Sequence, residues 1–425
     1  MPWNSLADQR PAAVALPADE GAVVAVVRAA TDAGLRVAPQ STGHGAGAMP
    51  DLTDVVLVRT EQMSDLSIDA ATARVGAGVR WLDVVEAAAS RGLGALHGSA
   101  PSVGVVGFSL GGGIGWYGRS LGLQCNSVTS VDLMLPDGSR VRADADHEPE
   151  LFWAVRGGGG SFGIVTAIEF RLHPIATTYA GFLLWDWRDA ERVLRRYAQW
   201  APSAPDEVTT AFRIMQVPRM PDIPEVVRGR QIAIVDGAVL ADDETAERIL
   251  APLRELKPEV DTFRRVPVDA VSRLHMDPDR PTPSVTDTAL LADLPPAGVD
   301  ALLPVAGPDS GTSLLMPAEL RQLGGAFDRA EPSGGALSRL PGRFLLSIVG
   351  VARSPEEESR ARGDVARVTT AMAPFGDGRR YLNFVDHPVD PSAGHDEATW
   401  TRLRRLRSSV DPGGLLVANH TVPPG

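Results

Sequence analysis

Three clusters of small residues in the first 165 positions constrain this sequence more than any other feature. They lie around His44, at 98–115 and at 156–163, and each is rich in glycine. Apolar runs at 35–38 and 55–58 predict two short buried strands on either side of the His44 cluster. Glycine lets main-chain amides approach a ligand closely, as a pyrophosphate requires. The residues alone therefore predict a cradle of loops for an anion or a nucleotide.

Composition limits the class of protein. A chain of 425 residues has room for two or three domains. Its 44% of apolar residues include no run long enough to span a membrane, which indicates a soluble globular protein. The net charge of -12 disfavours nucleic acid and anionic lipid as partners. Cys125 is the only cysteine, so an intrachain disulfide and a cysteine-rich metal site are excluded. With no recognisable signal peptide at the N-terminus, we expect a cytoplasmic protein.

The sequence pattern changes twice along the chain. Up to about residue 175, short strands alternate with glycine-rich loops. From 176 to 375, strand-like runs alternate with polar helices, and the proline-rich stretch 277–308 is predicted to be irregular. The last part, 376–425, contains a predicted helix at 399–408. Three structural parts are therefore expected, with boundaries near 175 and 375.

Two familiar motifs offer other interpretations of the glycines. Residues 158–163 fit the dinucleotide-binding pattern G-x-G-x-x-G, but the residues after them predict a strand where that fold needs a helix. Residues 107–111 fit the nucleophile elbow G-x-S-x-G of α/β-hydrolases, with Ser109 as nucleophile, Gly43-His44-Gly45 as oxyanion loop and His420 as base. The glycines at 111–115 do not favour the helix that an elbow requires. The hydrolase remains an alternative at this point.

Several further segments are distinctive when they are taken in order. They are Trp3-Asn4, Leu151 to Gly159, Tyr381-Leu382-Asn383-Phe384 and Val410-Asp411-Pro412. Together with the glycine-rich loops they resemble the berberine bridge enzyme-like branch of the vanillyl-alcohol oxidase and p-cresol methylhydroxylase flavoproteins. The resemblance implies an α+β fold. Its FAD-binding domain would be built from an N-terminal part (1–175) and a returning C-terminal segment (376–425), with an inserted substrate domain of antiparallel sheet and helices (176–375).

The resemblance also implies which residues bind FAD. They are Gln40, Ser41, Thr42, Gly43, His44, Gly45, Gly98, Ser102, Val103, Gly104, Gly107, Phe108, Gly112, Gly163, Ile164, Val165, Tyr381 and Asn383. His44 occupies the position that in this family bonds to the 8-methyl carbon of the flavin. Ala100 stands where relatives with two tethers have a cysteine, so His44 would be the only covalent link. The alternative for His44 is a simple hydrogen bond within the loop.

The same resemblance suggests a reaction. Tyr381 corresponds to a tyrosine that acts as base, and Val103 to a small valine that gives dioxygen access to the reduced flavin. The expected activity is an FAD-dependent oxidase that takes hydride from an alcohol or an activated C–H group of a small molecule, with a role in secondary metabolism on family grounds. A phenol titrates near pH ~10, and Arg379 and Arg380 could lower that value. Open alternatives are a structural Tyr381, a dehydrogenase of the same family, and a flavin-binding protein without turnover. Phe384 replaces a second tyrosine frequent in relatives, and the substrate stays unidentified.

Overall fold

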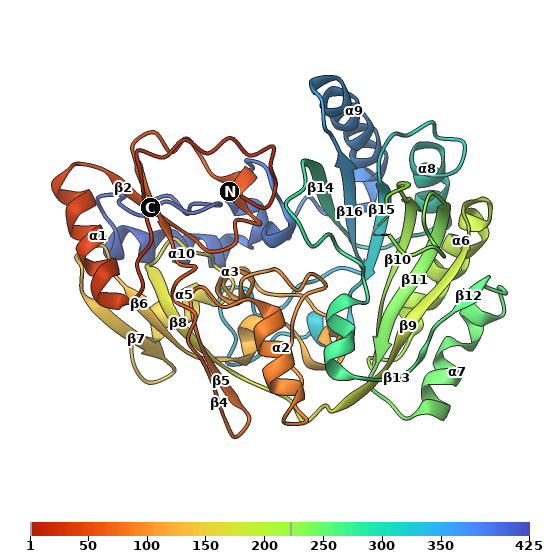
Figure 1. Cartoon of the computed structure of the whole chain (residues 1–425), viewed down its shortest axis with the longest axis horizontal. Coiled ribbons are helices and arrows are strands. Elements are labelled where there is room, and N and C mark those ends of the chain that lie inside the picture. Colours follow the sequence, from red (N-terminus) through yellow and green to blue (C-terminus); the bar gives the residue numbers. More distant parts are fainter. Residues whose placement is uncertain (1, 222) are drawn as a thin grey trace.

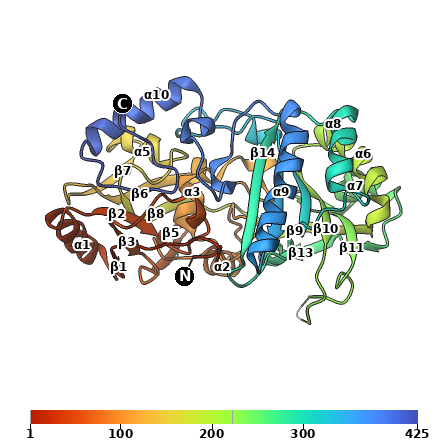
Figure 2. The same ribbon diagram turned by 90° about the horizontal axis from the view of Figure 1, so that it is seen from above.

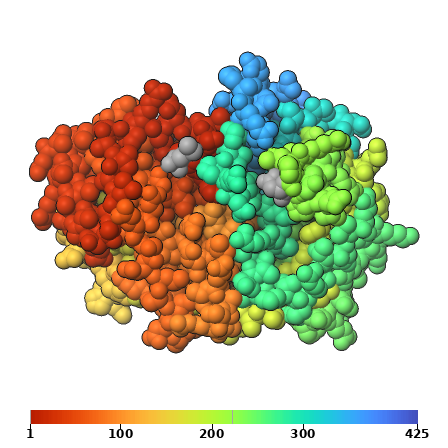
Figure 3. Space-filling model, viewed as in Figure 1, coloured from red at the N-terminus to blue at the C-terminus, as the bar shows by residue number. Residues whose placement is uncertain are grey.

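The computed structural model describes residues 2–221 and 223–425 and forms two lobes. The N-terminal part of the chain and its last residues build one lobe, and the middle of the chain builds the other (Figure 1). In the space-filling view the two lobes meet along a seam (Figure 3). No helix among the described residues is both long and apolar enough to cross a membrane.

The first lobe contains a small parallel sheet in the order β1-β3-β2. Its strands are β1 (Ala13–Ala15), β2 (Arg36–Gln40) and β3 (Val55–Arg59). Helix α1 (Glu20–Asp32) begins where the Asp19 carboxylate accepts a hydrogen bond from the Ala22 amide, and it buries an apolar face against this sheet. The C-terminal segment joins the sheet because Leu416 pairs with Val37 of β2. β2 leads directly into the loop around His44.

A second, antiparallel sheet of five strands completes this lobe in the order β4-β5-β8-β6-β7. The strands are β4 (Leu66–Asp69), β5 (Thr72–Gly76), β6 (Val128–Met134), β7 (Arg140–Asp144) and β8 (Ile164–Arg171). The helices around it are α2 (Trp81–Ala89), α3 (Val105–Leu110), α4 (Gly118–Leu121), α5 (Pro149–Val155) and α10 (Glu397–Val410). Residues of α2, α3, α5 and α10 pack with β5, β6 and β8 in one apolar core.

The second lobe is an eight-stranded antiparallel sheet in the order β12-β9-β11-β10-β15-β16-β14, with β13 also paired to β9. The strands are β9 (Thr177–Asp186), β10 (Val208–Gln216), β11 (Gln231–Val239), β12 (Val260–Asp261), β13 (Arg264–Pro267), β14 (Ser284–Leu291), β15 (Met316–Gln322) and β16 (Phe344–Val351). Its helices are α6 (Ala190–Trp200), α7 (Asp243–Arg254), α8 (Pro296–Ala306) and α9 (Pro355–Met372). Helices α6, α7 and α8 lie on the side of this sheet away from the first lobe (Figures 1 and 2). The largest apolar core fills the space between helices and sheet, so the other sheet face looks toward the first lobe.

The α+β fold class is confirmed, and the structure also corrects the sequence-based prediction. The proline-rich stretch 277–308 is not irregular, because it holds β14 and α8. Pro296 occupies the first turn of α8, where no amide hydrogen is needed. Helix α3 escaped prediction because glycines flank its six residues on both sides.

Candidate active site

A cavity of about 1470 Å³ lies between the two lobes. All three clusters of small residues contribute to its wall, and the inner face of the large sheet closes the opposite side. The volume exceeds the ~300–1000 Å³ of an ordinary small-molecule pocket. The space is sufficient for a large ligand together with a second, smaller one.

The loop after β2 presents donors to this cavity. Within the described part of the chain, none of the amides of residues 41–45 donates a hydrogen bond to another group. The buried Ser41 Oγ and Gln40 Oε1 also have no partner there. Buried polar groups in proteins are normally satisfied, so these atoms point to a polar ligand that completes them. Successive free amides suit the phosphates of a dinucleotide.

His44 is held in a fixed orientation at the same end of the cavity. Trp3 stacks on its ring with a centroid distance of 4.4 Å, and Nε2 lies 3.2 Å from the Ser102 Oγ. Burial lowers the pKa of His44 to about 4, despite the opposing effects of Asp277 and Ser102. The imidazole is therefore neutral at pH 7 and has a lone pair available on a ring nitrogen.

Residues 11–144 match a family model described as an FAD binding domain. The (R)-6-hydroxynicotine oxidase of Paenarthrobacter nicotinovorans is 30% identical over 356 residues, which is 79% of this chain and 77% of that protein. The chain belongs to the berberine bridge enzyme-like FAD-linked oxidoreductases. It is therefore an FAD-dependent oxidoreductase.

One further relative in sequence and one in structure support this assignment. The xylooligosaccharide oxidase of Thermothelomyces thermophilus is 35% identical over 192 residues, 43% of this chain and 39% of that protein. The berberine bridge enzyme-like protein 1 of Physcomitrella patens has the same fold, with a TM-score of 0.85, 21% identity and coverage of 100% of this chain and 94% of that one.

Most residues expected to bind the FAD of this oxidoreductase lie on the cavity wall. They are Gln40, Ser41, Thr42, Gly43, His44, Gly45, Gly98, Val103, Gly104, Gly107, Phe108, Gly163, Val165 and Asn383. Ser102 does not line the wall, but its hydroxyl contacts His44, which does. Gly112 and Ile164 lie elsewhere: Ile164 points into the core behind β8, because side chains alternate between the faces of a strand.

Tyr381 does not line the cavity either, which argues against its expected role as base. It is 1% exposed, and its hydroxyl accepts hydrogen bonds from the amides of Gly113 at 2.8 Å and Ile114 at 3.2 Å. Burial raises the pKa of this phenol above its usual value, against the smaller lowering effect of Asn383 and the Gly113 amide. Arg379 and Arg380 do not lower it, since they pair with Asp377 and Asp287. The tyrosine instead fixes the glycine-rich loop 111–115.

Phe384, three residues on, does face the cavity. Between them, Asn383 donates from Nδ2 to the carbonyl oxygen of Phe108 at 2.8 Å. In this segment, the side chains of Tyr381 and Asn383 thus hold α3 and the loop 111–115 that follows it, and Phe384 faces the cavity. A short 3₁₀ turn at Leu382–Phe384 gives the residues these different directions.

The hydrolase alternative does not fit the structure. Ser109 lies inside α3 and not at a turn between strand and helix, and it is 1% exposed. Its hydroxyl donates to the Val105 carbonyl at 2.8 Å. The Nε2 of His420 lies 3.1 Å from the carbonyl oxygens of Leu382 and Val385. Neither side chain is arranged for nucleophilic catalysis. The dinucleotide-binding motif at 158–163 leads into strand β8, as expected from its sequence.

Sequence reasoning missed a set of buried charges on the inner face of the large sheet. We call Arg213, Asp236, His275, Glu319 and Arg321 the inner-sheet charge cluster. All except Asp236 line the cavity, and His275 Nδ1 lies 2.8 Å from Asp236 Oδ2. His275 Nε2 lies 3.0 Å from Glu319 Oε1, and Arg213 pairs with Asp236. One sequence pattern could have revealed this cluster: charged residues at alternate positions of an otherwise apolar strand, as in Glu319-Leu320-Arg321.

Proposed function

We propose that this protein is an oxidase of a small molecule with an alcohol or an activated C–H group, and that His44 is its only covalent link to FAD. The observation that carries the proposal is the oriented, neutral His44 at the end of a loop whose amides are free. A ring nitrogen can bond to an electrophilic carbon only in its unprotonated form. Ala100 lines the same cavity and has no thiol, which supports a single tether.

The residues of the chain would divide the work as follows. Amides 41–45 and Ser41 bind the phosphates, and Trp3 and Ser102 hold the His44 ring. The bound flavin supplies a two-electron acceptor that dioxygen can reoxidise. Val103 lies on the cavity wall, where its small side chain would leave space for dioxygen, and this supports the oxidase over the dehydrogenase alternative. A role in tailoring a secondary metabolite stays part of the proposal.

The tether is tested by acid precipitation of the purified yellow protein. Flavin should stay in the pellet, and a proteolytic peptide containing His44 should have gained the mass of FAD. The variant His44→Ala should release its flavin into the acid supernatant. His147→Ala removes an exposed histidine and is the matched control that should keep the link. Release of flavin from the unchanged protein would exclude the tether.

The oxidase assignment needs a separate measurement. The flavin is reduced chemically without oxygen and then mixed with aerated buffer, while its absorbance and the release of hydrogen peroxide are followed. Rapid reoxidation with peroxide is expected. Slow reoxidation, together with fast transfer to an artificial acceptor, would identify a dehydrogenase. A screen that includes hydroxylated N-heterocycles and oligosaccharides, the substrates named for two relatives, would then narrow the substrate class.

A further inference from the structure

The inner-sheet charge cluster is costly to bury, and strand register sets the positions of its four sheet residues, while His275 comes from the loop before β14. Arg213 of β10 lies opposite Glu319 of β15, and Ala211 lies opposite both Arg321 of β15 and Asp236 of β11. Directly paired residues share a face of a sheet, so all four charged side chains point toward the cavity. A group of buried charges that lines a cavity is a candidate functional site.

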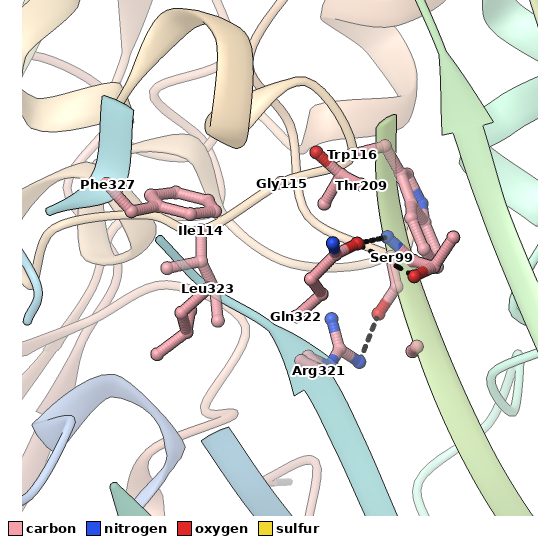
Figure 4. Close-up of a pocket in the computed structure, with 11 residues that line it drawn as sticks. Ser99, Ile114, Gly115, Trp116, Thr209, Arg321, Gln322, Leu323 and Phe327 are labelled. Carbon is pink, nitrogen blue, oxygen red and sulfur yellow. Dashed lines mark hydrogen bonds between the residues drawn. The ribbon is translucent and has the colours of Figure 1, made fainter. Parts of the chain in front are cut away.

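Arg321 is the member that reaches the first lobe. Its Nη2 donates to Ser99 Oγ at 3.1 Å and lies 3.2 Å from His275 Nε2 (Figure 4 shows the contact with Ser99). Its guanidinium stacks on the Phe384 ring with a centroid distance of 5.0 Å. Ser99 follows Gly98 in the second cluster of small residues. The arginine therefore lies where the sheet, the C-terminal segment and a cofactor loop meet.

One edge of this guanidinium is free. Nε lies 2.8 Å from Glu319 Oε1, and Nη2 is engaged as described, but Nη1 has no hydrogen bond to any residue that the structure describes. The side chain is 14% exposed and lines the cavity. A buried arginine with an unused pair of N–H donors is suited to an anionic oxygen.

The carboxylates of the cluster are engaged by other cations. Asp236 faces Arg213 and His275, and Glu319 faces His275 and Arg321. Burial alone would raise the pKa of Glu319, but Arg321 and His275 lower it to about 2. Burial and Arg213 would lower the pKa of His275, yet Asp236, Glu319 and Asp277 raise it above its usual value. The carboxylate of Glu319 is thus a fixed counter-ion and a poor proton acceptor at neutral pH.

We propose that Arg321 binds an anionic oxygen of the substrate, a carboxylate or an ionised aromatic hydroxyl, and holds it in the cavity between Phe384 and the Gly98-Ser99 loop. The proposal rests on the proposed function, since it assigns the substrate class of the same cavity. Arg321 is then a specificity-determining residue. Its planar donors fix the orientation of the substrate, and Phe384 offers an apolar face to the rest of an aromatic ring.

Binding can be measured without turnover, by calorimetric titration of the flavin-loaded protein. The probes are benzoate with its neutral counterpart benzamide, and 4-cyanophenolate with its neutral counterpart benzonitrile. At least one anion should bind about tenfold or more tightly than its neutral counterpart, as a charge-assisted hydrogen bond in a buried site predicts. Which anion is preferred distinguishes a carboxylate from a phenolate substrate.

The variants make the test specific. Arg321→Gln should abolish the preference for the anion. Arg321→Lys should keep part of it, because lysine retains the positive charge but lacks the planar pair of N–H donors. Arg343→Gln removes an exposed arginine just before β16, outside the cavity, and should keep the full preference. Flavin content and circular dichroism of each variant report whether it folds.

Two results would overturn the proposal: no preference for either anion in the unchanged protein, or a preference that survives in Arg321→Gln. Its failure is separable from a failure of the proposed function. Acid-stable flavin and reoxidation by dioxygen are measured on the same preparations and do not depend on Arg321. A protein that prefers the anion but releases its flavin would contradict the tether alone.

Discussion

Replacement of Tyr381 by phenylalanine separates a structural role from a catalytic one. The substitution removes only the hydroxyl oxygen, which accepts hydrogen bonds from the amides of Gly113 and Ile114. The ring and its contact with Phe384 stay in place. We expect Tyr381→Phe to loosen the loop 111–115 and to leave proton transfer intact.

The size of the effect follows from the two amides. A buried donor that loses its acceptor costs about 1–3 kcal/mol. The bond from Gly113, at 2.8 Å, is the stronger, and that from Ile114, at 3.2 Å, is the weaker. Together they amount to roughly 2–4 kcal/mol of local stability. Amide exchange in this loop should accelerate by roughly 30-fold to 700-fold, since about 1.4 kcal/mol corresponds to a factor of ten.

The assay combines hydrogen exchange of the peptide covering 111–115 with stopped-flow reduction of the flavin by substrate. Tyr117→Phe is the matched control, because Tyr117 is equally buried and its hydroxyl lacks a well-formed hydrogen bond within the described chain. Loss of a general base would slow flavin reduction by at least ~100-fold and change its pH profile. That result, with unchanged exchange in the loop, would refute the structural role of Tyr381.

Three further outcomes are expected. Burial lowers the pKa of His97 to about 4 in the folded protein. The unfolded chain keeps the usual pKa of ~6.5 and is protonated at higher pH, so up to about 3 kcal/mol of the free energy of unfolding should be lost as pH falls from 6.5 toward 4. Urea unfolding of His97→Asn should show a weaker pH dependence, and an identical one would contradict this. Arg407→Met removes the cation 2.8 Å from buried Asp411 and should lower the free energy of unfolding by about 3–5 kcal/mol. Arg402→Met breaks the half-buried pair with Glu150 and should lower it by less than about 1 kcal/mol. In Gly47→Ala the new Cβ would lie 2.6 Å from the Asp386 Oδ1 that accepts a hydrogen bond from the Gly47 amide. The loop around His44 would have to shift, so the ratio of flavin to protein in the purified variant should fall. An unchanged ratio would show that the loop adapts.

Local pattern was sufficient for much of the first lobe. The strands predicted at 35–38 and 55–58 are β2 (Arg36–Gln40) and β3 (Val55–Arg59), within two residues at each end, because apolar periodicity and turn residues act over neighbouring positions. The stretch 277–308 was mispredicted because its prolines suggest loop in isolation. One of them instead starts α8, whose apolar side is buried only once the large sheet is present.

The sequence by itself determined the three glycine-rich clusters and the singular position of His44, since backbone freedom and residue chemistry are local properties. Tertiary structure alone decided which side chains share the cavity. Tyr381 meets Gly113 across 268 positions, and Arg321 meets Ser99 across 222, so no local pattern could place either one. Strand register gathered the four sheet residues of the inner-sheet charge cluster, and a single turn pointed Tyr381 away from the ligand space and Phe384 into it.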